Sequence, residues 1–329
     1  MSEAKPGRSV SEVAVSAADE GQRIDNWLLR RLKGWPRGQV YRLLRSGQVR
    51  VNSRRARPSQ RLQDGDRVRL PPLARGQSGD DARGTPPPAL RKRIATSVLE
   101  EDDRLLVLDK PAGIAVHGGS GLSFGVIETL RALRPDAEFL ELVHRLDRET
   151  SGCLLVAKRR SALRDLHAQF REHAVDKRYL VLVRGRWQRG RDRVSLALDV
   201  GHRRGGERHV RVGGDGKPAV TEFRLVEDFG TASLLEARPE SGRTHQIRVH
   251  AAAVDHPVAG DDRYGDAAFN ETLAALGLDR LFLHAHLLSI RRPGTDEPQS
   301  FSAPLPPELA AVVEALSTQR RPAARARRG

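Results

Sequence analysis

An aspartate between two arginines, in the segment LVHRLDRETSG at residues 142–152, is the first candidate for chemistry in this sequence. Asp147 lies between Arg145 and Arg148, on polar turn-forming residues that precede an apolar stretch. A carboxylate held among cations keeps a low pKa, which suits a nucleophile or a base for a weakly acidic proton. A structural ion pair is the simpler interpretation of this segment alone. A glycosidase-like pair with Glu149 is disfavoured, because side chains two apart on an extended backbone point opposite ways.

Two further segments carry side chains that could bind an anion or a nucleobase. The segment GRTHQIRVH, at residues 242–250, looks like a helix start and offers backbone N–H groups, Arg243 and Arg248 to an anion. Phosphate contact and ordinary helix capping are the alternatives for it. In the segment DKRYLVLV, residues 176–183, Tyr179 lies at the mouth of a buried strand. There it is either a core-edge residue or a platform on which a base stacks.

The histidines and glycines do not form a recognisable metal or nucleotide site. His284 and His286 would share one face of a strand, but no acidic residue stands at a matching spacing. The single cysteine, Cys153, excludes a disulfide scaffold and a multi-cysteine zinc or iron–sulfur site. The glycine-rich residues 117–125 fit neither phosphate-loop template and indicate a structural turn or a substrate-side loop. We therefore expect no metal and no cofactor.

The charge of the chain points to a polyanionic partner. Its 329 residues carry 57 Lys+Arg against 42 Asp+Glu, a formal net charge of +15, and such a field favours nucleic acid. No apolar run approaches the roughly 18–20 residues of a membrane span. The N-terminal residues lack the apolar core of a secretory signal. We expect a cytoplasmic protein with no membrane partner.

The elements that must position these residues begin with a small basic module. Residues 1–20 are small and polar and are expected to form a flexible leader. Residues 21–72 predict two short helices followed by strands, an ααβ-type module in which Ile24 and Leu28 lie on one helical face. Fourteen basic and three acidic residues fall in this module, so it carries most of the positive charge.

A second, larger module follows a break in the pattern. Residues 73–95 are rich in proline and glycine and predict a linker. Residues 96–316 favour a mixed α+β domain, because strands outnumber helices and do not alternate regularly with them. Residues 317–329 predict a basic disordered tail. The strands expected in the larger module are Leu105–Leu108, Cys153–Ala157, Leu180–Val183, Val220–Val226 and Ser233–Ala237, and the helices are 162–170, 247–254 and 309–316.

These segments, in this order behind a basic ααβ module, resemble the RluA family of pseudouridine synthases that carry an N-terminal S4 RNA-binding domain. Residues Gly21–Leu70 are similar to the S4 domain, and Leu105–Gly113 is similar to the family's first motif. His144–Gly152 matches the catalytic HRLDxxTSG motif completely. Ala115–Gly125 is similar to the stretch that sets apart the RluC type, which acts on large-subunit ribosomal RNA.

The resemblance implies an α+β fold and assigns roles to residues. The fold is a small ααβ-type S4 domain plus a pseudouridine synthase domain with a mixed or antiparallel sheet. Asp147 would be the catalytic aspartate, Arg248 the arginine paired with it, and Tyr179 the tyrosine packing on the target base. Arg145 would enter the RNA where the uridine leaves. We also expect substrate contacts from His144, Arg243 and His245, and RNA contacts from the S4-like residues Arg23, Lys33, Arg42, Arg45 and Arg50.

The function implied is the isomerisation of specific uridines in large-subunit (23S) ribosomal RNA to pseudouridine, during subunit assembly and by a monomer. The reaction needs no cofactor or metal, since nothing is oxidised and no group is imported. The alternatives are a synthase for transfer RNA or another ribosomal uridine, and a non-catalytic RNA-binding or ribosome-assembly protein. The sequence leaves open whether Asp147 attacks the ribose, attacks the base or takes a ribose C2′ proton.

Overall fold

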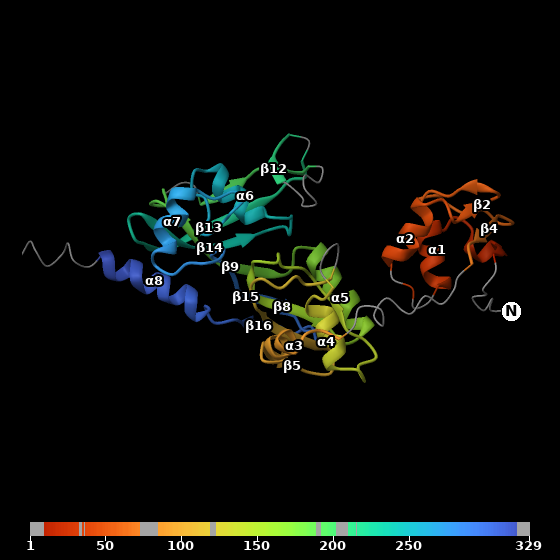
Figure 1. Ribbon diagram of the computed structural model, residues 1–329, viewed down its shortest axis with the longest axis horizontal. Helices are drawn as coiled ribbons and strands as arrows, with labels where there is room; N and C mark the ends of the chain where they lie inside the picture. The colour runs from red at the N-terminus through yellow and green to blue at the C-terminus, as the bar shows by residue number, and fades with distance from the viewer. Residues whose placement is uncertain are drawn as a thin grey trace, which may run out of the picture. The chain divides into compact units, whose positions relative to one another are not determined.

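The chain folds into two compact units, Met1–Thr85 and Pro86–Gly329, which are described separately. The computed structural model describes residues 10–32, 35, 37–72, 85–118, 123–188, 192–201, 210–214 and 216–320. The smaller unit carries the first two α-helices and the first four strands, and the larger one carries the rest (Figure 1). The α+β class expected from the sequence is confirmed.

The N-terminal unit packs two helices against a four-stranded antiparallel sheet with the strand order β1-β4-β2-β3. Trp27 and Leu28 of the first helix are fully buried in one core with Val40 of the second helix and Val68 of the sheet. The elements are β1 (Ser11–Ala14), the 3-10 helix η1 (Ala17–Asp19), α1 (Ile24–Arg31), α2 (Arg37–Arg45), β2 (Arg50–Val51), β3 (Arg54–Arg55) and β4 (Arg67–Leu70).

Strand β1 shows that the expectation of a flexible leader over residues 1–20 is wrong from residue 11 onward. Ser11–Ala14 pairs antiparallel with Arg67–Leu70, and Val15 is buried in the core of the unit. The alternation of Val13 and Val15 is too short to predict a strand. Residues 11–14 form one because the edge of β4 is available for pairing. Residues 1–9 of the expected leader lie outside the described residues.

The C-terminal unit is built on one mixed sheet of ten strands, with the path β10-β13-β14-β9-β15-β8-β6-β5 and with β16 beside β15 and β7 beside β8. Strands β15 and β8 run parallel, and the other described pairs of this sheet are antiparallel. The strands are β5 (Val98–Glu101), β6 (Leu105–Lys110), β7 (Glu141–Leu142), β8 (Ser151–Ala157), β9 (Asp176–Arg184), β10 (Arg193–Ser195), β13 (Val220–Asp228), β14 (Ala232–Pro239), β15 (Leu283–Arg291) and β16 (Pro298–Ser302).

Helices cover both faces of this sheet, and a small hairpin of β11 (Leu198–Val200) and β12 (Val210–Val212) stands apart from it. Along β6, Leu106 and Leu108 face a core shared with α3 and α4, whereas Leu105 and Val107 face a core shared with α5. Such alternation is what a strand buried on both sides requires. The helices are α3 (Pro88–Ala95), α4 (Val126–Leu133), α5 (Arg160–Arg171), α6 (Gln246–Ala253), α7 (Ala267–Ala274) and α8 (Pro307–Arg320).

The expected linker at residues 73–95 is wrong at its C-terminal end, where α3 forms. Proline at the first helical position, here Pro88, fixes φ near the helical value and is favourable there. Ile94 anchors the helix because it is fully buried in the core of the C-terminal unit. The expected tail at residues 317–329 likewise begins too early, since α8 continues to Arg320. Residues 73–84 and 321–329 lie outside the described part of the chain.

Gly152 marks the point where the Asp147 segment enters the sheet. It has φ +109°, and a Cβ atom there would lie 2.3 Å from the carbonyl oxygen of Ala285. That close approach is the start of the parallel pairing between β8 and β15, in which Gly152 is opposite Ala285. Only glycine fits both the backbone conformation and the space, so the end of the segment is fixed.

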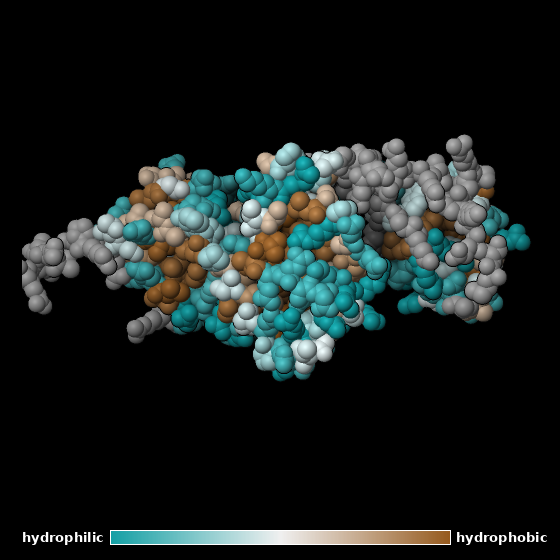
Figure 2. Space-filling view, turned by 90° about the horizontal axis from the view of Figure 1, so that it is seen from below, coloured by the Kyte–Doolittle hydropathy of each residue, from teal (hydrophilic) through white to brown (hydrophobic). Residues whose placement is uncertain are grey.

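Hydrophilic side chains cover most of the face seen in Figure 2, with separate apolar patches between them. Within the described residues, no helix combines the length and the apolar character that crossing a membrane requires.

Candidate active site

Two cavities of the C-terminal unit meet at Asp147. One has a volume of about 440 Å³ and is also lined by Tyr179 and Arg243. The other, of about 1020 Å³, is also lined by Arg263. Asp147 and Arg248 line both. The carboxylate of Asp147 is therefore open to space on two sides.

Each carboxylate oxygen of Asp147 faces a nitrogen at about 4 Å. The Arg145 guanidinium lies 4.0 Å from Oδ1, and Nε2 of His245 lies 3.9 Å from Oδ2. The Asp147 side chain is 21% exposed, so it is accessible from the cavity but largely shielded from bulk water. Of the two arginines that flank Asp147 in the sequence, Arg145 faces its carboxylate, whereas Arg148 contacts Glu149 at 3.4 Å.

The buried side chain of Lys110 binds the backbone of the Asp147 segment, a role that the sequence analysis missed. Its ammonium group is fully buried and donates to the carbonyl oxygens of Pro111, Ile114 and Arg148, at 2.8 to 3.1 Å. Burial lowers the pKa of Lys110 to about 7, while the charge of Glu149 opposes that shift. The signals in the sequence were a lysine at the end of an apolar strand and its place in Leu105–Gly113, the segment similar to the family's first motif.

The C-terminal end of the segment, at Ser151, is fixed by a buried series of hydrogen bonds. Arg280 donates to Ser151 Oγ at 2.6 Å, and Ser151 Oγ lies 2.9 Å from Nδ1 of His284. Nε2 of His284 lies 3.1 Å from the carbonyl oxygen of Ala303. Burial lowers the pKa of His284 to about 4, so its ring is a neutral structural group.

His286, which the sequence placed on the same strand as His284, lies 3.1 Å from a carboxylate oxygen of Glu236. Among the described residues, no group of three or more His, Cys, Asp or Glu side chains is arranged to hold a metal ion.

Arg248 is paired with Asp261, not with Asp147, which corrects the pairing expected from the resemblance. Its Nε and one terminal nitrogen each donate to a different oxygen of Asp261 at 2.7 Å. Asp261 is the stronger partner because its side chain is fully buried and already accepts the backbone N–H groups of Arg263 and Tyr264. This partner lies 13 residues further along the chain, where no spacing rule points to it.

The pair of Arg248 and Asp261 remains part of the cavity that contains Asp147. Burial acts to lower the pKa of Arg248, but the hydrogen bonds and charge of Asp261, with a further contribution from Asp147, leave it raised. Burial likewise acts to raise the pKa of Asp261, and Arg248 and the backbone N–H groups outweigh it, so the pKa is lowered. Both partners are therefore ionised at neutral pH.

This lowered pKa predicts how stability depends on pH. An Asp261→Asn variant should be less stable than the wild type by about 3–5 kcal/mol at pH 7, because a buried cation loses its partner. The contribution of Asp261 is fully present above its unfolded pKa, about 3.9, and is lost as pH falls through its lower folded pKa. Urea unfolding followed by circular dichroism should show that the difference in the free energy of unfolding between the wild type and the variant becomes smaller below about pH 4. A difference that widens on acidification would contradict the pairing.

Tyr179 lies on β9 and lines the smaller cavity together with Asp147. Its ring packs against two apolar clusters, one that contains Leu146 and one that contains Val181, so it is partly buried. Burial, and next the negative charge of Asp147, raise the pKa of its hydroxyl. Tyr179 therefore stays protonated and presents a neutral aromatic surface in the position expected for stacking on a base.

His144 is held as part of the cavity wall. Its ring stacks on Phe170 with 5.1 Å between centroids, and its Nε2 accepts the N–H group of Leu155 at 3.1 Å. Burial, with a contribution from the charge of Lys177, lowers the pKa of His144 to about 3. His144 is thus a neutral anchor for the segment, and its contact with substrate stays a prediction.

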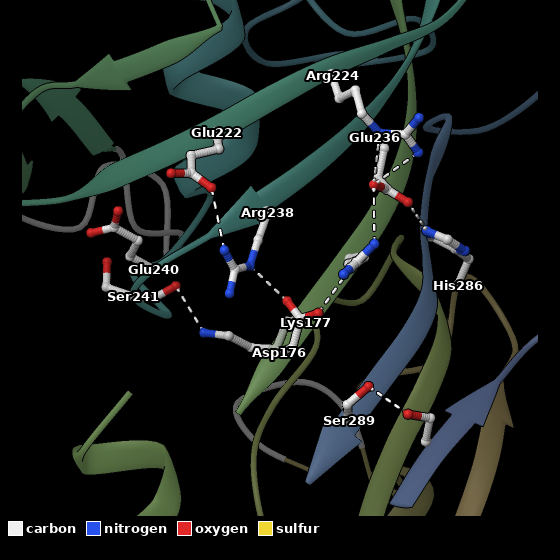
Figure 3. A network of polar contacts seen from close by, with 12 residues as sticks. Asp176, Lys177, Glu222, Arg224, Glu236, Arg238, Glu240, Ser241, His286 and Ser289 are labelled. Carbon is white, nitrogen blue, oxygen red and sulfur yellow. Dashed lines mark hydrogen bonds and ion pairs between the residues drawn. The ribbon is translucent and has the colours of Figure 1, made fainter. Parts of the chain in front are cut away.

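Arg243 and His245 come from the loop that leads into α6, and a network on the sheet holds that loop. Lys177 donates to the carbonyl oxygen of Ser241 at 3.3 Å. Beside it, Arg238 binds Asp176 at 2.7 Å (Figure 3). Figure 3 shows that Arg238 also contacts Glu222. Further across the sheet, Glu236 binds both Arg224 and His286. Arg243 itself is exposed at the rim of the smaller cavity.

The basic residues expected to bind RNA in the N-terminal unit differ in how free they are. Arg42, Arg45 and Arg50 are exposed on α2 and β2. Arg23 is committed to Asp25, with hydrogen bonds of 3.2 and 2.7 Å. Lys33 lies outside the described residues.

Comparison with known proteins gives the two units their families. Residues 104–253 match the RNA pseudouridylate synthase family, and residues 22–68 match the S4 domain family. The chain is 52% identical over 316 residues to ribosomal large subunit pseudouridine synthase C of Escherichia coli K12, covering 95% of this chain and 98% of that protein. It is 51% identical over 315 residues to the protein of the same name from Pasteurella multocida, covering 95% and 96%.

Solved structures show the same fold for the larger unit. Human RNA pseudouridylate synthase domain containing 4 matches with a TM-score of 0.58 and 26% identity, over 70% of this chain and 96% of that one. Human RNA pseudouridylate synthase domain containing 1 matches with a TM-score of 0.54 and 28% identity, over 69% and 94%. The segment with Asp147, which borders two cavities, lies within the part of the chain that matches the synthase family. The chain therefore belongs to the RNA pseudouridine synthases of the RluA family that carry an S4 domain, and it is an isomerase.

Proposed function

We propose that the protein isomerises specific uridines of large-subunit (23S) ribosomal RNA to pseudouridine, with Asp147 as its catalytic group and without a cofactor. The observation that carries this proposal is the identity of about half over nearly the whole length to enzymes named for the large ribosomal subunit. The position of Asp147, where two cavities meet, supports its catalytic role.

The reaction sets three physical tasks. The bond from ribose C1′ to N1 of uracil breaks, the base turns, a bond from C1′ to C5 forms, and the C5 proton leaves while N1 gains one. The uridine must first leave its stack, which costs a few kcal/mol. Charge must then be stabilised on the reacting nucleotide, and a base must remove the C5 proton.

The residues around Asp147 match these tasks. Tyr179 offers a neutral ring in the smaller cavity for stacking on the extruded base. Arg145 is half exposed at the mouth of the site, where its guanidinium can take the place of the departed uridine in the RNA. Asp147 acts in a partly water-shielded cavity, where a carboxylate stabilises positive charge better than it does in bulk water.

Conversion of defined RNAs tests the substrate assignment. Unmodified transcripts of 23S ribosomal RNA and of transfer RNAs are incubated with the protein, and pseudouridines are mapped by carbodiimide labelling and primer extension. We expect protein-dependent stops in 23S RNA and none in transfer RNA. Conversion restricted to transfer RNA would replace the substrate assignment, and no conversion of any RNA would favour a non-catalytic RNA-binding protein.

We further propose that the protein acts as a monomer while the large subunit is being assembled. The cavities at Asp147 are lined by residues of one chain, so a second copy is not needed to complete them. A uridine is also easier to extrude from RNA that has not yet been packed into the finished particle.

The exposed arginines of the S4 unit should account for part of the affinity for RNA. Replacing Arg42, Arg45 and Arg50 together by glutamine is expected to weaken binding and flatten its salt dependence. The log-log slope should fall by up to about three units, since each phosphate contact contributes roughly 0.7–0.9. Filter binding to a 23S fragment at several salt concentrations measures this slope.

A control with the same change in net charge separates local contact from overall charge. Arg159, Arg186 and Arg291 are exposed on the catalytic unit and pair there with surface carboxylates. Their combined replacement by glutamine should leave the slope nearly unchanged. Equal effects of the two triple variants would mean that the S4 arginines do not contact phosphates.

A further inference from the structure

His245 approaches Asp147 from a strained backbone position. It precedes α6 with φ 55° and ψ 19°, in the left-handed region that only a few per cent of non-glycine residues adopt. Strain of this kind persists only where the surroundings enforce it, and it concentrates at functional sites. The result is that Nε2 of His245 lies 3.9 Å from Oδ2 of Asp147. The state of that nitrogen therefore matters to the catalytic carboxylate.

Tyr264 controls the other nitrogen of the same ring. Its hydroxyl oxygen lies 2.9 Å from Nδ1 of His245, and its ring contacts the His245 ring edge-on at 5.6 Å. The same oxygen accepts the backbone N–H group of Val210 at 3.2 Å. Val210 belongs to β12, which lies beside α6 (Figure 1).

One proton lies between Tyr264 and Nδ1 of His245, and two arguments place it on the tyrosine oxygen. An oxygen that already accepts an N–H group is polarised toward donating its own proton. If Nδ1 carried the proton instead, the neutral ring would turn the lone pair of Nε2 toward the carboxylate of Asp147, which is electrostatically unfavourable.

We propose that Tyr264 is a positioning residue that keeps His245 in the tautomer with its proton on Nε2, so that an N–H group faces Asp147. Burial lowers the pKa of His245, while the charge of Asp147 opposes that shift, which fits a neutral ring at pH 7. The carboxylate of Asp147 then has the guanidinium of Arg145 at one oxygen and the N–H group of His245 at the other.

Tyr264 supports Arg248 as well. The Arg248 guanidinium lies over the Tyr264 ring at 5.1 Å, and the backbone N–H group of Tyr264 donates to Asp261, the partner of Arg248. Tyr264 thus connects His245 and Arg248, which both line the cavity of Asp147. This inference rests on the proposed catalytic role of Asp147.

Nitrogen NMR of the full-length wild-type protein tests the tautomer without any measurement of activity. Protein labelled with ¹⁵N on histidine is studied at pH 7.5, and the His245 signals are assigned with a His245→Gln variant. Protonated and unprotonated ring nitrogens of a neutral histidine have well-separated chemical shifts. We expect the proton on Nε2. A proton on Nδ1 in the wild type would overturn the proposal, whatever the variants do.

A Tyr264→Phe variant tests the consequence for catalysis. It keeps the ring beneath Arg248 and removes only the hydroxyl group. We expect kcat to fall by about 10-fold, since misplacing a group near the reacting atoms costs up to about 100-fold, with KM within about twofold and with the His245 signals shifted toward a mixture of tautomers. Unchanged His245 signals or an unchanged kcat would contradict the proposed role.

Ser233→Ala is the matched control. Ser233 Oγ is also a buried hydroxyl of the catalytic unit that accepts a backbone N–H group, from Trp187, and it donates to the carbonyl of Gly185. Its loss should leave the His245 signals and kcat unchanged. Retained activity in an Asp147→Asn variant would instead remove the proposed catalytic role of Asp147, while the tautomer measured in the wild type would stand by itself.

Discussion

An Asp147→Asn variant is expected to release no measurable tritium from RNA that carries [5-³H]uridine, while it still binds that RNA. The substitution keeps the size of the side chain and its place where the two cavities meet. It removes the negative charge and the basic oxygen that stabilise the reacting nucleotide. Losing the central electrostatic and acid–base group of a water-poor site should lower the rate by at least about 1,000-fold.

Glu149→Gln is the control for this variant. Glu149 lies two residues away and contacts Arg148 at 3.4 Å on the exposed side of the segment. It undergoes the same chemical change, and the variant should keep most of its activity. If Glu149→Gln were as inactive as Asp147→Asn, two carboxylates would share the chemistry. Turnover retained by Asp147→Asn would remove Asp147 from it.

An Arg248→Lys variant is expected to lose most of its turnover, on the order of 100-fold, because a misplaced site group carries a cost of that size. The guanidinium of Arg248 donates one hydrogen bond to each oxygen of the fully buried carboxylate of Asp261. An ammonium group is a point charge and cannot reproduce that fork. The variant should also lose about 1.5–3 kcal/mol of stability, the worth of one hydrogen bond to a charged group. Steady-state kinetics and urea unfolding measure the two effects.

Arg134→Lys is the matched comparison for Arg248→Lys. Arg134 also binds a carboxylate with two nitrogens, at 3.3 and 2.6 Å from the oxygens of Glu101, but these side chains are 24% and 28% exposed, whereas those of Arg248 and Asp261 are 11% and 0% exposed. Surface pairs contribute little to stability, so the variant should resemble the wild type in both measurements. Wild-type turnover in Arg248→Lys would mean that the buried pair does not position the site.

The sequence was most informative where one segment carries a whole chemical pattern. Asp147 with its flanking arginines, Tyr179 at the start of a buried strand and Arg248 on a short helix were all found, and the structure brings them to the same cavity. Spacing and residue type singled out these three residues but left their roles open, and only the resemblance to the family assigned a role to each.

What the sequence could not show was the choice of partners over long distances. Asp261 and Tyr264 follow α6 in a loop with no periodic pattern, and only the folded chain reveals that they bind Arg248 and His245. Lys110 was visible as a residue but not as the support of the Asp147 segment, 38 residues away. These contacts are tertiary, so they override any expectation based on neighbours in the sequence.

The errors in the fold have the same cause. Strand β1 exists because β4 offers it an edge, and its four residues, Ser11–Ala14, carry no recognisable strand pattern of their own. Helix α3 lies in a stretch whose prolines suggested a linker, and burial of Ile94 is what stabilises it. In both places the residues have only a weak local preference for secondary structure, and packing against an element distant in the sequence stabilises the strand or helix.

Mapping of pseudouridines in the large-subunit RNA of living cells tests the central claim most directly. Cells that lack the gene are supplied with either the wild-type protein or the Asp147→Asn variant, expressed at equal levels. We expect specific 23S pseudouridines to disappear on deletion, to return with the wild type and to stay absent with the variant. A full set of 23S pseudouridines in the deletion strain, or their return with Asp147→Asn, would contradict the claim.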